Sequence, residues 1–387
     1  MLELLTTFPY DSNTAQVLTS LAEVITEGRR SSQNNRDDAL RFLHEGLELF
    51  QRCLTVQELQ FSGSQEMMQM GDEDAPGAEN GDDSGDREMI SNSSDAAEDE
   101  QWASVLEPVT KDTLVDTAIA QLQTLTIACG LLTSDPGGGL TWLEEYSDNL
   151  LRCKIATYVE GTNRQHELNL AMANFTCALA DANYRTGPID LETYERELKS
   201  TFGGDLDLSQ DPQGLCDRAD ALITFTSTVL ESISLTVAKS REELSFLSNL
   251  LWKQLTSAST SLTSASKLPS ATNLAKINIA RGDVELRRLC LGESPLEHAA
   301  AKRSAAILLK NAQTYYRGAA ALARNDGFED EEREATVKLA VSGTIAGDEG
   351  DQSGLDARDR KAILVVVEEM VEDGIVGSEW LQKLGIT

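Results

Sequence analysis

The chain has 387 residues, of which 64 are acidic and 33 basic, so its net charge at neutral pH is −31. A field of this sign repels the phosphates of nucleic acid and anionic membrane surfaces, and it favours encounters with cationic proteins. The length allows two globular domains or one elongated helical array. Solubility alone is an alternative explanation of the charge.

Apolar residues recur at helical spacing from the first part of the chain onwards, and prolines number only eight in the whole sequence. The spacing predicts helices over residues 13–28, 36–61, 110–132, 140–159 and 163–184. The glycine-rich residues 135–139 are expected to end the third of these helices. The last two are expected to form an antiparallel pair about residues 160–162.

Residues 71–100 contain twelve acidic side chains against the single base Arg87. Met89 and Ile90 are the only large apolar residues there, so this stretch cannot form a core and is expected to be a disordered acidic insert. Without it the chain still has a net charge of −20. The body of the protein is therefore acidic as well.

After the insert, the sequence contains capping residues that mark where helices are expected to begin. Asp190 is a candidate N-cap, and Asp211 followed by Pro212 predicts another start. Residues 240–243 and 294–297 are both predicted to form capping boxes, the second with proline at the first helical position.

The chain is expected to end with a flexible loop over residues 342–359 and a helix over 361–373. That helix and the apolar residues at 380–386 are expected to cover the last exposed face of a helical array. A detachable binding motif at 380–386 is the alternative. We predict five segments: N-terminal helical repeats (1–62), the acidic insert (63–101), a helical array (102–341), an acidic loop (342–359) and C-terminal capping helices (360–387).

Similar spacings of small and large apolar residues recur along the chain. They occur at Ala171, Phe175, Ala178 and Leu179; at Gly46, Phe50, Cys53 and Leu54; at Ala258, Leu262, Ala265 and Pro269; and, as L-A-x6-G-D-x-E, from Leu274 to Glu285. This pattern, over residues 36–324, resembles the tetratricopeptide (TPR) repeat. The resemblance implies an all-α fold in which antiparallel helix hairpins stack into an α-solenoid. A non-repetitive helical bundle is the alternative, because ordinary helix packing gives similar spacings.

The sequence offers no catalytic, cofactor-binding or metal-binding constellation. His44, His166 and His298 fall in separate predicted helices, without the spacing of a zinc site. The glycines at 137–139 lack the G-K-[ST] ending of a phosphate loop. We therefore expect no enzymatic activity, no cofactor and no metal.

The six cysteines lie singly, and none forms a C-x-x-C pair, so we expect reduced thiols that pack as small core residues. Residues 1–9 are apolar, but they lack a basic flank and are too short for a secretory signal. The apolar run 362–367 is too short to span a bilayer. We expect a protein of the cytoplasm, the nucleus or both. The cysteines are Cys53, Cys129, Cys153, Cys177, Cys216 and Cys290.

Some TPR proteins clamp the C-terminal carboxylate of heat-shock chaperones with lysine, arginine and asparagine. The candidates for such a clamp here are Asn273, Lys276, Asn278, Arg281, Lys302, Arg303 and Lys310. The complete pattern cannot be assembled from these positions, and the acidic body opposes an acidic tail.

The sequence favours a non-enzymatic binding protein, an assembly chaperone or adaptor for a basic client such as a ribosomal protein or a histone. The acidic insert within a helical array resembles the layout of histone and ribosomal-protein chaperones. The alternative is a structural TPR-like scaffold within a larger complex, with a passive insert. The client-binding residues, which act together through charge, are predicted to be Asp72, Glu73, Asp74, Asp82, Asp83, Asp86, Glu98, Asp99 and Glu100.

Overall fold

The computed structural model describes residues 2–26, 33–71, 108–132, 138–203, 206–235, 240–347 and 360–377. These residues form helices and no strand, which confirms the predicted all-α class. The helices are α1 (Leu2–Thr26), α2 (Gln33–Gly71), α3 (Lys111–Leu131), α4 (Gly139–Cys153), α5 (Ile155–Val159), α6 (Gln165–Thr186), α7 (Leu191–Thr201), α8 (Pro212–Leu235), α9 (Arg241–Ala265), α10 (Leu274–Cys290), α11 (Ala299–Asp326), α12 (Glu329–Ile345) and α13 (Arg360–Glu372).

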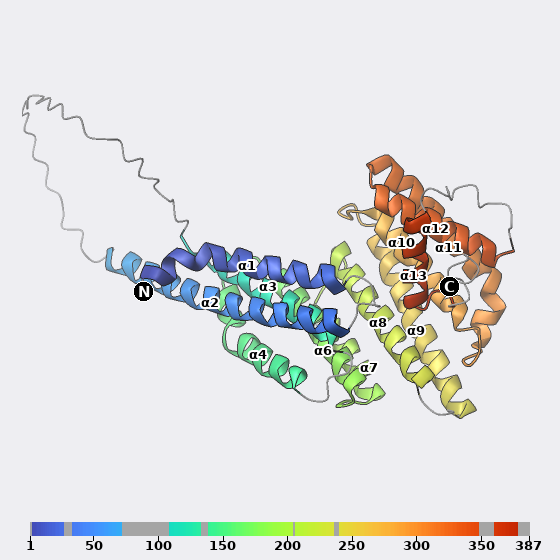
Figure 1. Cartoon of the computed structure of the whole chain (residues 1–387), viewed down its shortest axis with the longest axis horizontal. Helices are drawn as coiled ribbons and strands as arrows, with labels where there is room; N and C mark the ends of the chain where they lie inside the picture. Colours follow the sequence, from blue (N-terminus) through green and yellow to red (C-terminus); the bar gives the residue numbers. More distant parts are fainter. Residues whose placement is uncertain are drawn as a thin grey trace, which may run out of the picture.

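The molecule is elongated, with α1 to α4 in one half and α9 to α13 in the other (Figure 1). Each long helix packs on the next along a row: α1 on α2, α2 on α3, α3 on α6, and α6 on α8. The succession continues through α9, α10, α11 and α12 to α13. The short helix α5 packs on α3, and α7 packs on α6.

Three apolar clusters follow one another along this row. The first contains Leu122 and Phe175, the second Tyr194 and Leu251, and the third Tyr316. Helix α6 contributes side chains to the first and second clusters, and α10 contributes to the second and third. Neighbouring clusters are therefore joined through shared helices.

Small residues allow close approach at two of the positions noted in the sequence. A Cβ atom at Gly46 would lie 3.4 Å from the carbonyl oxygen of Ala15, where α2 meets α1. At Gly282 it would lie 2.4 Å from Cε1 of Tyr316, so α10 accepts the tyrosine ring of α11 only because glycine is there. Small side chains at such contacts bring helix axes together.

The polar residues beside Gly282 connect four helices. Asp283 accepts hydrogen bonds from the Tyr316 hydroxyl (2.7 Å, α11) and from the Lys338 ammonium (2.8 Å, α12). The buried carboxylate of Glu285 accepts from Arg288 (3.0 Å) and lies within hydrogen-bonding distance of Ser259 on α9. The G-D-x-E sequence is thus a structural junction.

Three of the predicted helix starts are confirmed. Asp190 accepts from the Thr193 amide at the start of α7, and α8 begins at Pro212. Ser240 and Glu243 form a reciprocal capping box, with distances of 3.2 and 2.8 Å. Each of these starts depends on groups close together in the sequence, which is why sequence reasoning found them.

The capping box predicted at residues 294–297 is wrong. These residues form a turn in which the amide of His298 donates to the carbonyl of Leu291 (2.8 Å) and Leu296 is buried. Helix α11 begins only at Ala299, and His298 is its N-cap. Burial of Leu296 and the packing of the His298 ring on Trp252 (4.8 Å between centroids) favour the later start.

The helix predicted over residues 140–159 is broken at Lys154 into α4 and α5. Glu58 on α2 accepts hydrogen bonds from the Lys154 ammonium (3.1 Å) and from the Tyr158 hydroxyl, so a tertiary contact fixes the break. Helix α6 then packs chiefly on α3, α7 and α8, and not as the predicted hairpin partner of residues 140–159.

Three described helices are longer than predicted. Helix α1 begins at Leu2 and includes Pro9, α2 continues to Gly71, and α12 continues to Ile345. Ser342, the predicted start of a loop, is fully buried within α12. Residues 72–107, 348–359 and 378–387 lie outside the described residues, and with them the centre of the predicted insert, the second loop and the apolar residues at 380–386.

The C-terminal helix α13 buries Val367 and Met370 in the third cluster, against α12. The residues that follow it reach back to α10. Arg287 donates to the carbonyl of Asp373 and also donates to Ser227 on α8 (2.9 Å), while the Cys290 thiol lies 3.3 Å from the carbonyl of Ile375. The chain end therefore contacts an earlier helix of the row.

One described helix, α3, is long and apolar enough by composition to cross a membrane, and the sequence reasoning overlooked it. In the fold α3 packs between α2 and α6, and 61% of its apolar stretch is buried. Its place in the first core accounts for its composition.

Five of the cysteines are reduced thiols among the described residues, with no disulfide between them. Cys53, Cys129 and Cys177 are buried, and Cys216 and Cys290 are half-buried. Burial raises the thiol pKa to about 11 for Cys53 and about 12 for Cys129 and Cys177, so these side chains stay protonated and pack as small apolar groups. The side chain of Cys153 lies outside the described set.

Candidate protein-binding groove

The nine acidic residues predicted to bind a client, from Asp72 to Glu100, all lie outside the described residues. That prediction therefore stays a prediction. The described residues provide a different candidate site, and it is formed by the helices themselves.

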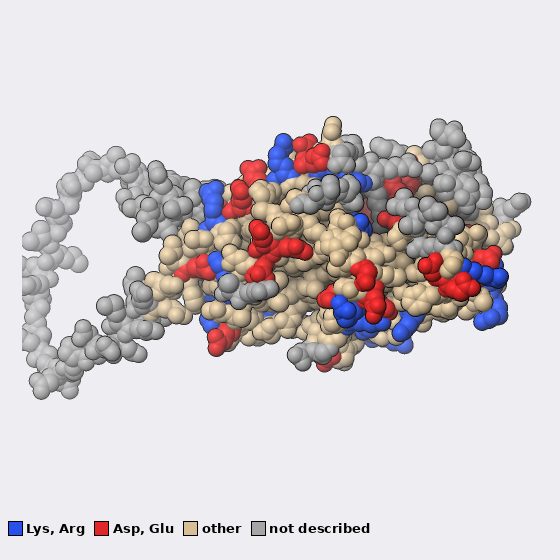
Figure 2. Space-filling model, turned by 90° about the horizontal axis from the view of Figure 1, so that it is seen from below, with Lys and Arg blue, Asp and Glu red and all other residues tan. Residues whose placement is uncertain are grey.

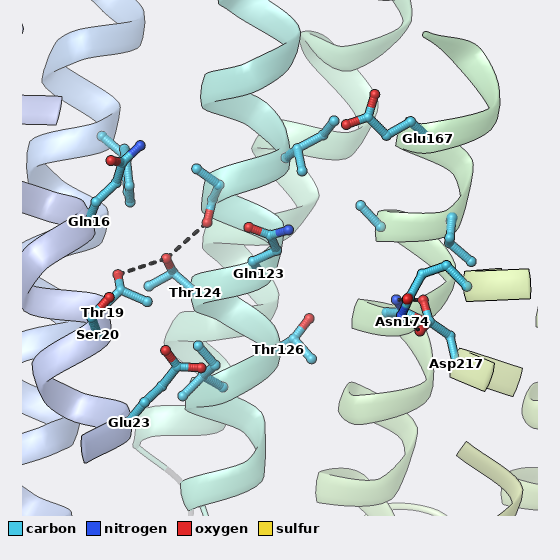
Figure 3. A pocket seen from close by; sticks show the side chains of 17 residues that line it. Gln16, Thr19, Ser20, Glu23, Gln123, Thr124, Thr126, Glu167, Asn174 and Asp217 are labelled. Carbon is cyan, nitrogen blue, oxygen red and sulfur yellow. Dashed lines mark hydrogen bonds between the residues drawn. The ribbon is translucent and has the colours of Figure 1, made fainter. Parts of the chain in front are cut away.

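Helices α1, α3, α6 and α8 together line a hollow of about 770 Å³ (Figure 3). A second hollow of about 300 Å³ adjoins it between α3, α6, α7 and α8. The two share Thr126, Asn174 and Asp217 as lining residues, so they form one continuous groove, which we call the α1–α8 groove.

Polar positions at helical spacing form the walls of this groove. Gln16, Ser20 and Glu23 lie on one face of α1, three or four residues apart, and Thr124 of α3 faces α1, while Gln123 and Thr126 lie on the side of α3 toward α6 (Figure 3). Hydrogen bonds fix the contact between the two helices. Thr19 bonds to Thr124 (3.1 Å), whose hydroxyl lies 2.9 Å from the carbonyl of Ala120.

No lysine or arginine lines the described part of the groove, whereas five carboxylates do. They are Glu23, Glu167, Asp181, Asp217 and Asp220. On the face drawn in Figure 2, several groups of charged side chains are mixed and one is mainly acidic, with uncharged surface between them. The groove lining differs from the mixed groups because it has carboxylates and no lysine or arginine among the described residues.

Two of the five carboxylates are neutralised by neighbouring cations. Arg164 forms an ion pair with Glu167 and lowers the pKa of that carboxyl. Asp181 is almost completely buried, pairs with Arg185 (2.8 Å) and accepts hydrogen bonds from Tyr194 (2.8 Å) and Thr228 (2.7 Å). Asp181 thus joins α6, α7 and α8 and has little capacity left for a ligand.

Glu23, Asp217 and Asp220 carry the uncompensated charge. Asp217 accepts from the amides of Asn174 (2.6 Å) and Gln213 (2.7 Å), which orient its carboxylate without neutralising it. The side chains of Glu23 and Asp220 make no hydrogen bond or ion pair with another described residue. An ammonium or guanidinium group would supply the missing countercharge.

The side chain of Asp220 is exposed to solvent by surface area, although many protein atoms lie around its carboxyl group in the groove. The partial desolvation by these atoms, together with the nearby charge of Asp217, raises the pKa of Asp220 to about 6. The ionised form is disfavoured until a positive charge approaches, so the carboxyl would gain from binding a cation.

Each of the three histidines makes a local contact. No group of three or more His, Cys, Asp or Glu is placed to hold a metal ion within the described residues. His44 pairs with Glu48 (3.2 Å), and His166 pairs with Asp211 (2.9 Å). His298 caps α11, and burial with nearby Arg303 and Arg288 lowers its pKa.

The carboxylate-clamp candidates on and before α10 form hydrogen bonds, an ion pair and a ring contact with neighbouring residues. Asn273 caps the helix, and its amide donates to Glu331 (3.2 Å), which also pairs with Lys276 (3.7 Å). Arg281 donates to Asn278 (3.1 Å) and stacks on the ring of Tyr315. These contacts leave α10 without a convergent set of free cations.

Comparisons of this chain with known proteins found no relative. No protein family, no curated protein and no solved structure matches this chain.

Sequence reasoning missed the α1–α8 groove because its residues are dispersed over six helices. One signal was present. Gln123, Thr124 and Thr126 lie among the apolar residues of a long, largely buried helix, and polar residues in such a helix need partners or solvent. Their connection to Asp217 and Asp220 required knowing that α3 packs beside α6 and α8.

Proposed function

We propose that the protein is a non-enzymatic binding protein of TPR-like α-solenoid architecture, an assembly chaperone or adaptor for a basic client such as a ribosomal protein or a histone. The observation that carries this proposal is the α1–α8 groove, which is lined by carboxylates and by no lysine or arginine among the described residues. A Lys- or Arg-rich segment of the client occupies the groove.

The order of helix contacts supports the solenoid part of the proposal. Each long helix packs on the next helix of the row, and adjacent apolar clusters share a helix. Stability is then a sum of local interfaces, as in repeat proteins. The close approach at Gly282 is also the kind of helix contact that the TPR resemblance implies.

The size and chemistry of the groove suit a polypeptide. The main hollow is within the range of sites that bind a few side chains, and its amide and hydroxyl groups can hydrogen-bond a peptide backbone. Asp217 and Asp220, one turn apart on α8, can meet two cationic side chains of one client segment. The predicted acidic insert adds long-range attraction and increases the rate of encounter.

The test uses a fluorescent Lys/Arg-rich peptide and three forms of the full chain. These are the unaltered protein, a groove variant (Glu23→Gln, Asp217→Asn and Asp220→Asn) and a chain that lacks residues 72–100. We expect the groove variant to weaken binding about tenfold or more, because it removes the uncompensated charges. Deletion of 72–100 should lower the association rate and flatten the salt dependence between about 50 and 300 mM.

A matched variant controls for net charge. Glu145→Gln, Glu192→Gln and Glu293→Gln also remove three negative charges, but from exposed positions outside the groove. This control should change the affinity less than about twofold, because exposed charges contribute little individually. Equal loss in both triple variants would show that net charge, and not the groove, attracts the peptide. Absence of binding to the unaltered protein would contradict the proposal as a whole.

A structural scaffold is the second candidate, and an exposed apolar stripe on α1 favours it. Val17, Leu21 and Val24 lie three or four residues apart and are 65, 40 and 63% exposed. Such a stripe at one end of a helical row can dock on another subunit. Binding of this kind would be insensitive to salt and to deletion of 72–100.

A further inference from the structure

Helix α11 is the most basic of the described helices in a chain with about twice as many acids as bases. Its 28 residues include five lysines and arginines, and its one acidic residue, Asp326, is the last. The basic residues are Lys302, Arg303, Lys310, Arg317 and Arg324. The groove proposed above does not use them.

Four of these cations recur every seven residues, at 303, 310, 317 and 324. Seven residues are about two helical turns, or about 10.5 Å along the axis, so the four lie in one row. All four side chains are exposed, whereas Leu308, Tyr316 and Ala319 are buried on the other side of α11. The row therefore faces away from α10 and α12.

Most of the row is without a countercharge. Arg303, Lys310 and Arg317 form no ion pair with any described residue, and only Arg324 pairs, with Glu332 (2.7 Å). By contrast, many other cations of the described chain pair with a carboxylate, for example Lys154 with Glu58 and Lys338 with Asp283.

A seam of uncharged residues runs beside the basic row. Ile307, Thr314 and Ala321 each follow a member of the row by four residues, and all three are exposed. Ile307 is 63% exposed and is the large apolar side chain of this seam. A charged row beside an uncharged seam at heptad spacing is the pattern of a helix that pairs with another helix.

We propose that the exposed face of α11 docks an acidic amphipathic helix of a partner protein. The partner presents carboxylates at heptad spacing to Arg303, Lys310 and Arg317 and an apolar side chain to Ile307. This surface goes beyond the proposed function, since it lies on another helix and selects the opposite charge. Nucleic acid fits less well, because single cations about 10.5 Å apart match its dense phosphates poorly and Ile307 would have no role.

The probe is a fluorescent helical peptide of about 28 residues, four heptads, with glutamate at every seventh position and leucine four residues later. We expect it to bind the full-length protein. Reversal of the row (Arg303→Glu, Lys310→Glu, Arg317→Glu) should weaken binding at least about tenfold, and Ile307→Ser should weaken it by a smaller factor. Circular dichroism checks that each variant is folded. We expect it to be, because the substituted positions are exposed.

The control reverses three other exposed cations, Arg241→Glu, Lys253→Glu and Lys267→Glu, and changes the net charge equally. It should alter the affinity less than about twofold. Equal weakening by both triple variants, equal binding of a peptide with the same residues in scrambled order, or tighter binding of a duplex DNA would each overturn the proposal. Sedimentation provides one further test. If the unaltered protein self-associates and the α11 reversal abolishes that association, the occupant is a second copy of this chain and the proposal is overturned.

Discussion

Asp220 differs from the other groove carboxylates in its combination of enclosure and missing countercharge. Asp217 is oriented by Asn174 and Gln213, and Asp181 is neutralised by Arg185. Asp220 instead has a pKa raised to about 6 by burial and by Asp217. A carboxyl that gives up its proton reluctantly in the folded protein is better adapted to binding a cation than to stabilising the fold.

This predicts a specific pH dependence of stability. The folded protein holds the Asp220 proton more tightly than the unfolded chain, so the contribution of this carboxyl to stability falls as the pH rises from about 4 to about 6. The Asp220→Asn variant has no such loss. We expect it to gain free energy of unfolding relative to the unaltered protein, and to gain more at about pH 7 than at about pH 5.

Urea unfolding of both proteins at the two pH values measures this difference. The exposed Glu192→Gln substitution on α7 is the control and should give nearly the same difference at both pH values. A difference for Asp220→Asn that is constant with pH would contradict the raised pKa.

At the scale of helices, the contact of α10 with α11 depends on one missing side chain. Gly282 faces the ring of Tyr316, which is fully buried and fixed through its hydroxyl to Asp283. The same Asp283 carboxylate pairs with Lys338, whose side chain is 6% exposed. Burial alone disfavours the ammonium, but Asp283 and Glu334 outweigh it and raise the pKa of Lys338. The ring therefore cannot move without disturbing three helices.

Substitution of this glycine tests the contact. A Cβ at position 282 would lie 2.4 Å from the Tyr316 ring, so we expect Gly282→Ala to lower the free energy of unfolding by about 1–3 kcal/mol. Gly318→Ala on α11 is the control, because its Cβ would meet nothing within 4 Å. That change should be neutral or stabilise by up to about 1 kcal/mol through helix propensity. Urea unfolding measures the stability of both variants. Equal stability of the two would disprove the close contact between position 282 and the Tyr316 ring.

At the scale of the whole molecule, three apolar clusters of the described residues are joined through the helices α6, α10 and α11, each of which contributes to two of them. In such a row, loss of one cluster need not unfold its distant neighbours, because each helix depends chiefly on the helices beside it. The third cluster, with α12 and α13, lies at the opposite end from α1 (Figure 1).

This arrangement predicts local unfolding. Met370 is completely buried in the third cluster, so Met370→Asp places an unpaired charge there. We expect hydrogen exchange measured by mass spectrometry to accelerate in α12 and α13 and to remain unchanged in α3. Val365→Asp, at a 46% exposed position of the same helix, is the control and should change neither region. Equal acceleration in α3 would indicate a single cooperative unit in place of a row.

The sequence by itself determined the all-α class and the helix starts at Leu191, Pro212 and Arg241. These features depend on interactions within a few residues, such as apolar periodicity and a capping side chain. The acidic character of the body was also readable, because charge is additive along a chain.

Only the tertiary structure decided the break at Lys154, the late start of α11 and the contact of the chain end with α10. Each depends on a group far away in sequence: Glu58, Trp252 and Arg287. The groove and the exposed face of α11 also required the tertiary structure. Each consists of helix faces that no other described helix covers. A local pattern shows which residues share a face, but only the packed fold shows whether that face is covered.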